Sequence, residues 1–210
     1  MRLSDPQHLR QRKKAETRER IHKVGLQLFN RQGFAETTIA QIAAEADVAP
    51  RTVFQHYPTK DDIVFGDVEG ALQAFDAGLK SRPPGVTAID AVRAWLDQVA
   101  VGWLEPDTEV QVRLVAEVPS VAARKTQILD RFREPLTAAI ATDLDRPTDD
   151  LAVQLSGWVA IGGLLQIEAL VSDRIRMDGT MPSTSQIDAV LRQVERFIRS
   201  GVGAVDHERP

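Results

Sequence analysis

The sequence predicts an all-α fold of about nine helices, and three observations support this prediction. Apolar residues recur at intervals of three and four along nearly the whole chain, which is the period of an α-helix. No segment alternates apolar and polar residues as a half-buried strand does. Ser or Thr stands three residues before Gln or Asp at the start of several apolar stretches, a spacing typical of capped helices.

The composition is that of a globular protein with an apolar core. The chain has 210 residues, of which 43% are hydrophobic and 27% are charged, and it has no cysteine. The absence of cysteine excludes a disulfide framework, a thiolate metal site and a cysteine nucleophile. The N-terminal segment lacks the apolar core of a signal peptide, and we find no run of about 18 apolar residues. We therefore expect a cytoplasmic protein with no membrane partner.

The charge is distributed unevenly along the chain. The net charge is −4 at pH 7. Residues 1–60 carry eleven Lys and Arg against six Asp and Glu, a balance of +5, whereas residues 61–210 carry fifteen against twenty-four, a balance of −9. A basic N-terminal part on an otherwise acidic chain suggests that this part binds a polyanion, although a solvated basic tail has the same composition.

A first helix is expected over 16–32, because its apolar residues share one face. Gly33 ends this helix, since glycine adopts the left-handed backbone of a C-cap without strain. Phe34 is then placed to pack back on Phe29 or Leu28.

Two short helices follow, joined by a tight turn. Thr38 and Gln41 form a capping box, in which the hydroxyl and the amide each satisfy a free N–H group. Asp47 lies in the turn and tolerates the left-handed conformation better than most residues. Pro50 starts the next helix, where its missing N–H costs nothing, and Pro58 ends that helix.

The rest of the chain predicts six further helices. Thr59 with Asp62, Thr148 alone, and Ser185 with Asp188 are expected to cap three of them. The Pro- and Gly-rich segment SRPPG separates the first two of the six. The expected helices span 60–79, 87–103, 108–118, 120–144, 148–173 and 185–200.

Two of these helices have unusual features. Pro135 lies inside the apolar pattern of 120–144, which predicts a kink or a boundary there. The segment 148–173 is apolar on most sides and is therefore expected to be buried, either in a core or in an interface. Its polar residues argue against a membrane span: Gln154, Ser156, Gln166 and Glu168.

The three short helices within the first 57 residues predict a helix-turn-helix. The third helix of such a motif lies in a DNA major groove and presents its residues to base edges. Val53 and Tyr57 are expected to hold this helix to its core. Arg51, facing outward, suits a bidentate contact with guanine, and Gln55 suits adenine.

Other residues of the motif suit contacts with the DNA backbone. Thr52 could bind a phosphate or touch a thymine methyl group, and His56 is expected to face the groove. The N–H groups near Thr37 and Thr38 suit a phosphate, and so does the helix start at Lys60. The candidate DNA-binding residues are Thr37, Thr38, Arg51, Thr52, Gln55, His56, Tyr57 and Lys60.

The basic segment RQRKKAETRER, residues 10–20, precedes the motif. It could be an arm that enters an adjacent minor groove or follows phosphates. It could equally be a flexible, solvated tail.

The segment ETTIAQIAAEADVAPRTVFQHYPTKDDIV resembles the DNA-binding signature of the TetR family of transcriptional regulators. The resemblance covers residues 16–65, and the rest matches only as an all-α architecture of suitable length. It implies a homodimer with a reading head at 1–60 and a helical ligand-binding and dimerisation domain at 61–210. It also implies a palindromic operator, repression, and release by a small-molecule effector. The last two long helices would form the dimer interface as a four-helix bundle.

The chain departs from the family pattern at four positions. Asp47 replaces the usual turn glycine, and Ala49 stands where a capping Ser or Thr is common. Arg51 stands where Gly is frequent, and Phe54 replaces a common Tyr. The operator sequence therefore cannot be carried over from relatives.

Aromatic residues of the C-terminal part are candidate walls of an apolar ligand cavity, although core packing would use the same residue types. The residue pattern of 113–136 is similar to that of regulators that respond to acyl-CoA-like or other lipophilic molecules. The candidate ligand-binding residues are Trp95, Trp103, Arg113, Phe132, Trp158 and Gln166.

No catalytic or nucleotide-binding motif is present: HExxH, GxxxxGK[ST] and GxSxG are all absent. We therefore expect no enzyme, no cofactor and no metal site. The alternatives are a helical small-molecule carrier or enzyme that retains a non-functional helix-turn-helix, and a helical adaptor that binds protein through its long apolar helix.

Overall fold

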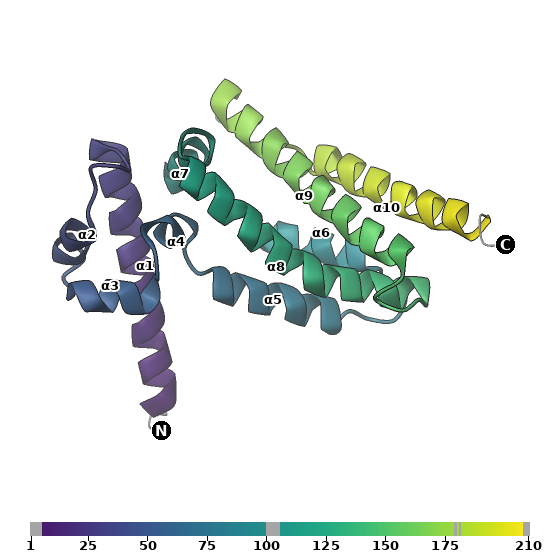
Figure 1. Cartoon of the computed structure of the whole chain (residues 1–210), viewed down its shortest axis with the longest axis horizontal. Helices are drawn as coiled ribbons and strands as arrows, with labels where there is room; N and C mark the ends of the chain where they lie inside the picture. Colours follow the sequence, from purple (N-terminus) through teal and green to yellow (C-terminus); the bar gives the residue numbers. More distant parts are fainter. Residues whose placement is uncertain (1–5, 100–105, 179, 181, 208–210) are drawn as a thin grey trace. The chain divides into compact units, whose positions relative to one another are not determined.

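The computed structural model describes residues 6–99, 106–178, 180 and 182–207, and it contains ten helices and no strand within them. The all-α prediction is confirmed (Figure 1). The helices are α1 (Pro6–Gln32), α2 (Ile39–Glu45), α3 (Pro50–His56), α4 (Lys60–Phe65), α5 (Val68–Lys80), α6 (Ala88–Val99), α7 (Pro106–Glu117), α8 (Pro119–Leu144), α9 (Leu151–Asp178) and α10 (Thr184–His207).

The expected helix over 60–79 is in fact two helices, α4 and α5. Gly66 separates them with a φ of 65° and a ψ of −137°, a backbone conformation that favours glycine. A Cβ atom on Gly66 would lie 3.3 Å from Nε2 of His22. The apolar spacing continues across the break, and for this reason the sequence pattern alone did not reveal it.

The chain forms two compact units, Met1–Val68 with Pro106–Thr126, and Glu69–Glu105 with Gln127–Pro210. The first unit therefore contains more than the helix-turn-helix, because α7 packs against α1 and α4. These units do not follow the expected division at residue 60.

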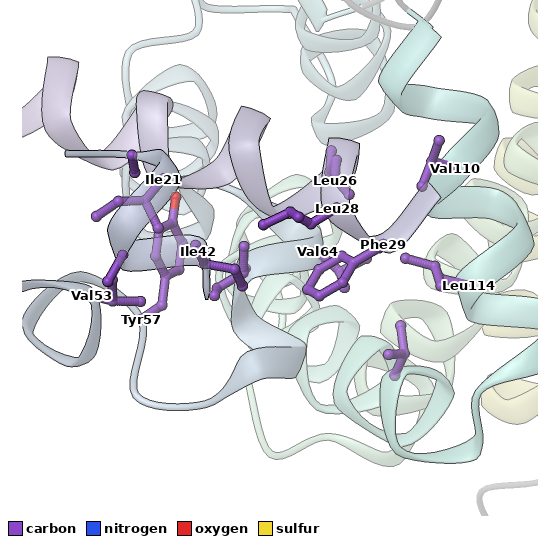
Figure 2. Close-up of a cluster of buried hydrophobic side chains, with 14 residues drawn as sticks. Ile21, Leu26, Leu28, Phe29, Ile42, Val53, Tyr57, Val64, Val110 and Leu114 are labelled. Carbon is purple, nitrogen blue, oxygen red and sulfur yellow. The ribbon is translucent and has the colours of Figure 1, made fainter. Parts of the chain in front are cut away.

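One hydrophobic core holds the first unit together (Figure 2). It takes side chains from the helix-turn-helix and also from α7 and the first turn of α8. A segment more than 40 residues further along the chain thus helps to fix the reading head. The residues are Ile21, Leu26, Leu28, Phe29, Ile42, Ala43, Ala46, Val53, Tyr57, Ile63, Val64, Val110, Leu114 and Val121.

The second unit contains α5, α6, α9, α10 and the larger part of α8. Helix α9 lies very close to both of its neighbours at glycine residues. A Cβ atom on Gly157 would lie 2.0 Å from Oγ1 of Thr137 in α8, and one on Gly163 would lie 2.4 Å from Cγ2 of Val194 in α10. These glycines allow the helices to pack closely.

The structure corrects two expected caps. Asp150, not Thr148, caps α9, because the Ala152 N–H donates a hydrogen bond to Asp150 Oδ1 at 2.8 Å. Ser183 forms a capping box with Gln186 at the start of α10, where Ser185 with Asp188 was expected. In each case a neighbouring residue has the same capping chemistry, and the direction of the preceding chain decides between them.

The structure also shows where α8 and α10 end. Helix α8 continues through Pro135, so that the missing N–H interrupts its hydrogen-bond ladder without ending it. Helix α10 continues past Gly201 to His207.

By length and composition, Leu151–Arg174 could cross a membrane, contrary to our expectation that no segment would qualify. One such helix is a weak indication, since the core helix of a globular protein meets the same criteria. Helix α9 packs along α10. Its buried residues include Ala152, Val153, Ala160, Ile161, Ile167 and Val171.

Candidate nucleic-acid interface

The turn between α2 and α3 is fixed by backbone hydrogen bonds. Thr38 and Gln41 form the expected capping box at the start of α2. Asp47 adopts a φ of 52°, and the Val48 N–H donates to the Ala43 carbonyl at 3.0 Å. Arg20 Nε donates to the Ala46 carbonyl at 2.9 Å, which ties the turn to α1.

Helix α3 presents one face to the core and the other to solvent. It begins at Pro50 without a side-chain cap, as the sequence predicts for Ala49. Val53 is fully buried, whereas Arg51 and Gln55 are exposed. The two exposed side chains are four positions apart and therefore lie on the same face of the helix, as a base-reading pair requires.

Two further residues complete the outer surface of α3. Thr52 is half-buried at the edge of the exposed face. Phe54 is 53% exposed, which is unusual for a large aromatic side chain without a partner in the core.

Tyr57 lies in the core rather than on the exposed face of α3. Its side chain is 2% exposed, and its hydroxyl donates a hydrogen bond to the Arg18 carbonyl at 3.1 Å. Burial raises the pKa of the Tyr57 hydroxyl well above its usual range, so that it stays protonated as this bond requires. This position supports the inward role expected for Tyr57 and does not fit a DNA contact.

Lys60 also makes contacts within the protein. Its ammonium group donates to the Phe34 carbonyl at 2.6 Å and the Thr37 carbonyl at 3.0 Å, and it lies 4.3 Å from the centroid of the Phe34 ring. Burial is the main cause that lowers the pKa of Lys60. These contacts hold the start of α4 against the loop before α2, and the phosphate contact expected at the start of α4 stays a prediction.

The two threonines before α2 differ in exposure. Thr37 is buried, and its hydroxyl donates to the Gly33 carbonyl at 2.7 Å. Thr38 is exposed at the helix start. Of this pair, only Thr38 has a side chain that DNA could reach.

His56 ends α3 and is half-buried beside α1. Its Nδ1 atom is buried and has no hydrogen-bond partner among the residues that the structure describes. Burial lowers the pKa of His56, and the positive charges of Arg18 and Lys14 lower it further. The imidazole is therefore neutral at pH 7.

Of the ligand-binding candidates that the structure describes in the second unit, Trp95 and Phe132 lie together, and Trp158 and Gln166 do not join them. Trp95 and Phe132 belong to an aromatic cluster with Phe75, with ring centroids 5.1 to 5.8 Å apart. Trp158 is 55% exposed on α9, and the Arg133 guanidinium lies 4.6 Å from the centroid of its ring. Trp158 is thus not a wall of an enclosed cavity.

The remaining ligand-binding candidates lie elsewhere. Arg113 belongs to the first unit and donates to Asn30 at 2.8 Å. Gln166 is exposed on α9, and Trp103 falls outside the residues that the structure describes. A cavity of about 290 Å³ in the second unit lies between the end of α8, the second half of α10 and the start of α6, and none of the four candidates that the structure describes in this unit lines it.

Comparisons with known proteins agree with this geometry. Residues 21–65 match the family described as bacterial regulatory proteins, tetR family. Residues 87–198, more than half of the 210, match the MftR C-terminal domain. The chain belongs to the TetR family of transcriptional regulators.

Two curated relatives are regulators of the same kind. TcmR from Streptomyces glaucescens is 34% identical over 149 residues, which cover 65% of this chain and 66% of TcmR, just under two thirds of its length. The putative mycofactocin biosynthesis regulator MftR from Mycobacterium tuberculosis is 25% identical over 155 residues, covering 72% of this chain and 77% of MftR. These relatives of the TetR-family chain are transcriptional regulators, not enzymes.

A solved structure supports the fold. The complex of triclosan with SmeT, the repressor of a Stenotrophomonas maltophilia efflux pump, has a TM-score of 0.56 and 18% identity. The match covers 85% of this chain and 91% of SmeT. At this level of identity, the similarity concerns the TetR-family fold alone.

Proposed function

We propose that this TetR-family regulator is a repressor that binds a palindromic operator as a homodimer and releases it when a small lipophilic molecule binds. The main support is the outer face of α3, where Arg51 and Gln55 stand exposed on a helix anchored by Val53 and Tyr57. A short rigid helix with exposed base-reading side chains is what major-groove recognition needs.

The proposed division of roles follows the exposure of each residue. Arg51 and Gln55 read base edges, and Thr52 and Thr38 bind the backbone. Lys60, Thr37 and Tyr57 act indirectly, because their polar groups hold the reading head together.

The homodimer is supported by an exposed apolar stripe. Leu151, Leu155, Trp158 and Leu165 follow the helical spacing along α9, and Phe197 is exposed on α10. Exposed apolar groups in such a row indicate a protein interface. We propose that α9 and α10 of two copies form a four-helix bundle, which would set two half-sites about 34–36 Å apart or a multiple of that distance.

The class of effector is supported by an aromatic cluster. The Phe75–Trp95–Phe132 cluster offers an apolar environment that suits a lipophilic molecule, and acyl-CoA-like compounds are one such class. An effector that binds the DNA-free form better must lower operator affinity by the same factor, because the two equilibria are linked. The regulator would act on DNA in the cytoplasm.

The test is a DNA-binding measurement on the purified full-length chain. Fluorescence anisotropy with fragments from upstream of its own gene and with scrambled duplexes should show a preference of about 10³ or more for one fragment at physiological salt. The preference should be lost on addition of the effector. If no fragment is preferred and binding does not depend on salt, the regulator function is wrong, and a carrier with a non-functional helix-turn-helix becomes the better account.

A further inference from the structure

Helix α1 begins well before the hydrophobic core of the first unit. It runs without a break from Pro6 (Figure 1), whereas Ile21 is the first buried residue among its described side chains, which begin at Leu9. At 1.5 Å per residue, this leading part is about 22 Å long. The basic segment 10–20 is therefore helical, and each side chain has a defined place around the helix.

One face of this leading part is basic. Arg10, Lys14 and Arg18 follow one another at intervals of four, so that they form a row along the helix. The row continues, at helical spacing, the face that carries Ile21 into the core. It therefore lies on the side of α1 that faces the rest of the reading head.

The row begins beside the end of α3. The Arg18 carbonyl accepts the hydrogen bond of Tyr57, and the Arg18 guanidinium pairs with Asp67. The charge of Lys14 acts on His56, the last residue of α3, and helps to lower its pKa. Arg10 follows one turn further from the core.

The opposite face of α1 has its charges neutralised. Arg12 pairs with Glu16 at 3.3 Å, and Lys23 pairs with Glu19 at 3.1 Å. Arg10 and Lys14, by contrast, are exposed and have no carboxylate partner within the described part of the chain. Arg10 and Lys14 thus leave uncompensated positive charge on the side of α3.

We propose that Arg10 and Lys14 bind DNA backbone phosphates beside the bases that α3 contacts. This inference rests on the proposed DNA-binding function and adds an anchoring site outside the helix-turn-helix. The two residues are about 6 Å apart along the helix axis, so that each can reach a phosphate of its own. Such contacts carry no sequence information but fix the position of the reading head on the duplex.

The test compares salt dependence between two double variants of the full-length protein. The probes are a duplex that the wild-type protein selects from a random pool, and a scrambled duplex. With Arg10→Gln and Lys14→Gln together, the slope of log K against log salt should fall by about 0.9 per lost contact, or about 1.8 per chain. Affinity should fall by a similar factor on both duplexes.

The control is Arg12→Gln with Lys23→Gln, which removes the same charge from the opposite face. It should change the slope much less. An equal change in both double variants would show a general charge effect and overturn the inference. An unchanged slope in the Arg10 and Lys14 variant would also overturn it, while the preference of the wild type for its selected duplex would leave the proposed function standing.

Discussion

Tyr57 is the single tyrosine of the chain, and its hydroxyl lies inside the reading head. Burial raises its pKa above the usual value of 10.0. The folded state therefore holds the phenolic proton more tightly than the unfolded state does. This contribution to stability is fully present below the unfolded pKa and is lost as the pH rises through the folded pKa.

The titration of this tyrosine can be measured directly, because no other residue contributes a phenolate signal. We expect the phenolate absorbance of the native protein to appear only at a pH above the ordinary value of about 10, and that of the urea-unfolded chain to appear near that value. Tyr57→Phe should remove the signal and cost about 0.5–1.5 kcal/mol of unfolding free energy at pH 7. Identical native and unfolded titrations would contradict the buried position.

Arg51 supplies the second prediction for a single residue. Arg51→Ala should lower affinity for the preferred duplex by about 1–3 kcal/mol and change affinity for scrambled DNA much less. The reason is that a bidentate contact with guanine is available only at the correct base pair. Equal losses on both duplexes, measured by anisotropy at one salt concentration, would assign Arg51 to a phosphate instead.

Lys60 and Thr37 mark the limit of residue-level prediction from sequence. A lysine at a helix start and a threonine before a helix both have the chemistry of phosphate ligands. In the fold, the Lys60 ammonium donates to two carbonyls of the preceding loop, and the Thr37 hydroxyl donates to the Gly33 carbonyl, while phosphate binding by the N–H groups at these helix starts stays a prediction. The sequence shows which groups can donate a hydrogen bond, but the partner depends on which loop lies near in space.

At the scale of elements, local signals predicted helix starts well where one residue had the right chemistry. The capping boxes at Thr38 and Thr59 are present as expected. Gly33 ends α1, and the ring of Phe34 packs on that of Phe29 with 4.9 Å between the centroids. The prediction was wrong where two neighbouring residues could cap, as before α9 and α10. The helical period alone also predicted α4 and α5 as one helix, because a glycine turn does not interrupt an apolar pattern.

The contact between α9 and α10 gives a prediction for an element. Gly163→Ala would place a methyl group 2.4 Å from Cγ2 of Val194, a buried side chain with restricted rotamers. The helices must separate, which should cost about 1–3 kcal/mol of unfolding free energy in urea. The matched control is Gly78→Ala in α5, where the added methyl group would have no tertiary contact within 4 Å among the described residues. There the helix propensity of alanine should instead stabilise by up to about 1 kcal/mol.

For the whole molecule, the sequence predicted the helix-turn-helix but not the extent of the unit that contains it. Val110 and Leu114 of α7 lie in the same core as Ile42 and Val53. Contacts between segments so far apart in sequence leave no periodic signal. The ligand-binding candidates could not be resolved for a related reason, since an aromatic residue in a helix has the same pattern whether it lines a cavity, packs in a core or lies on an outer face.

Trp158 belongs to the last of these classes, and its exposed position on α9 argues for assembly. Leu155→Glu would place a charge in the middle of the stripe formed by Leu151, Leu155, Trp158 and Leu165. In a dimer this charge would be buried without a partner, a change that is strongly destabilising for the interface. We expect sedimentation velocity to show a monomer and circular dichroism to show wild-type helicity.

Operator binding should fall together with dimerisation, because a single reading head contacts only one half-site. The control is Ala77→Glu on the exposed face of α5, which adds the same charge away from the stripe and should leave both properties unchanged. A Leu155→Glu protein that stays dimeric would place the interface on another surface. A monomer that still binds the full palindrome with wild-type affinity would separate DNA recognition from the stripe altogether.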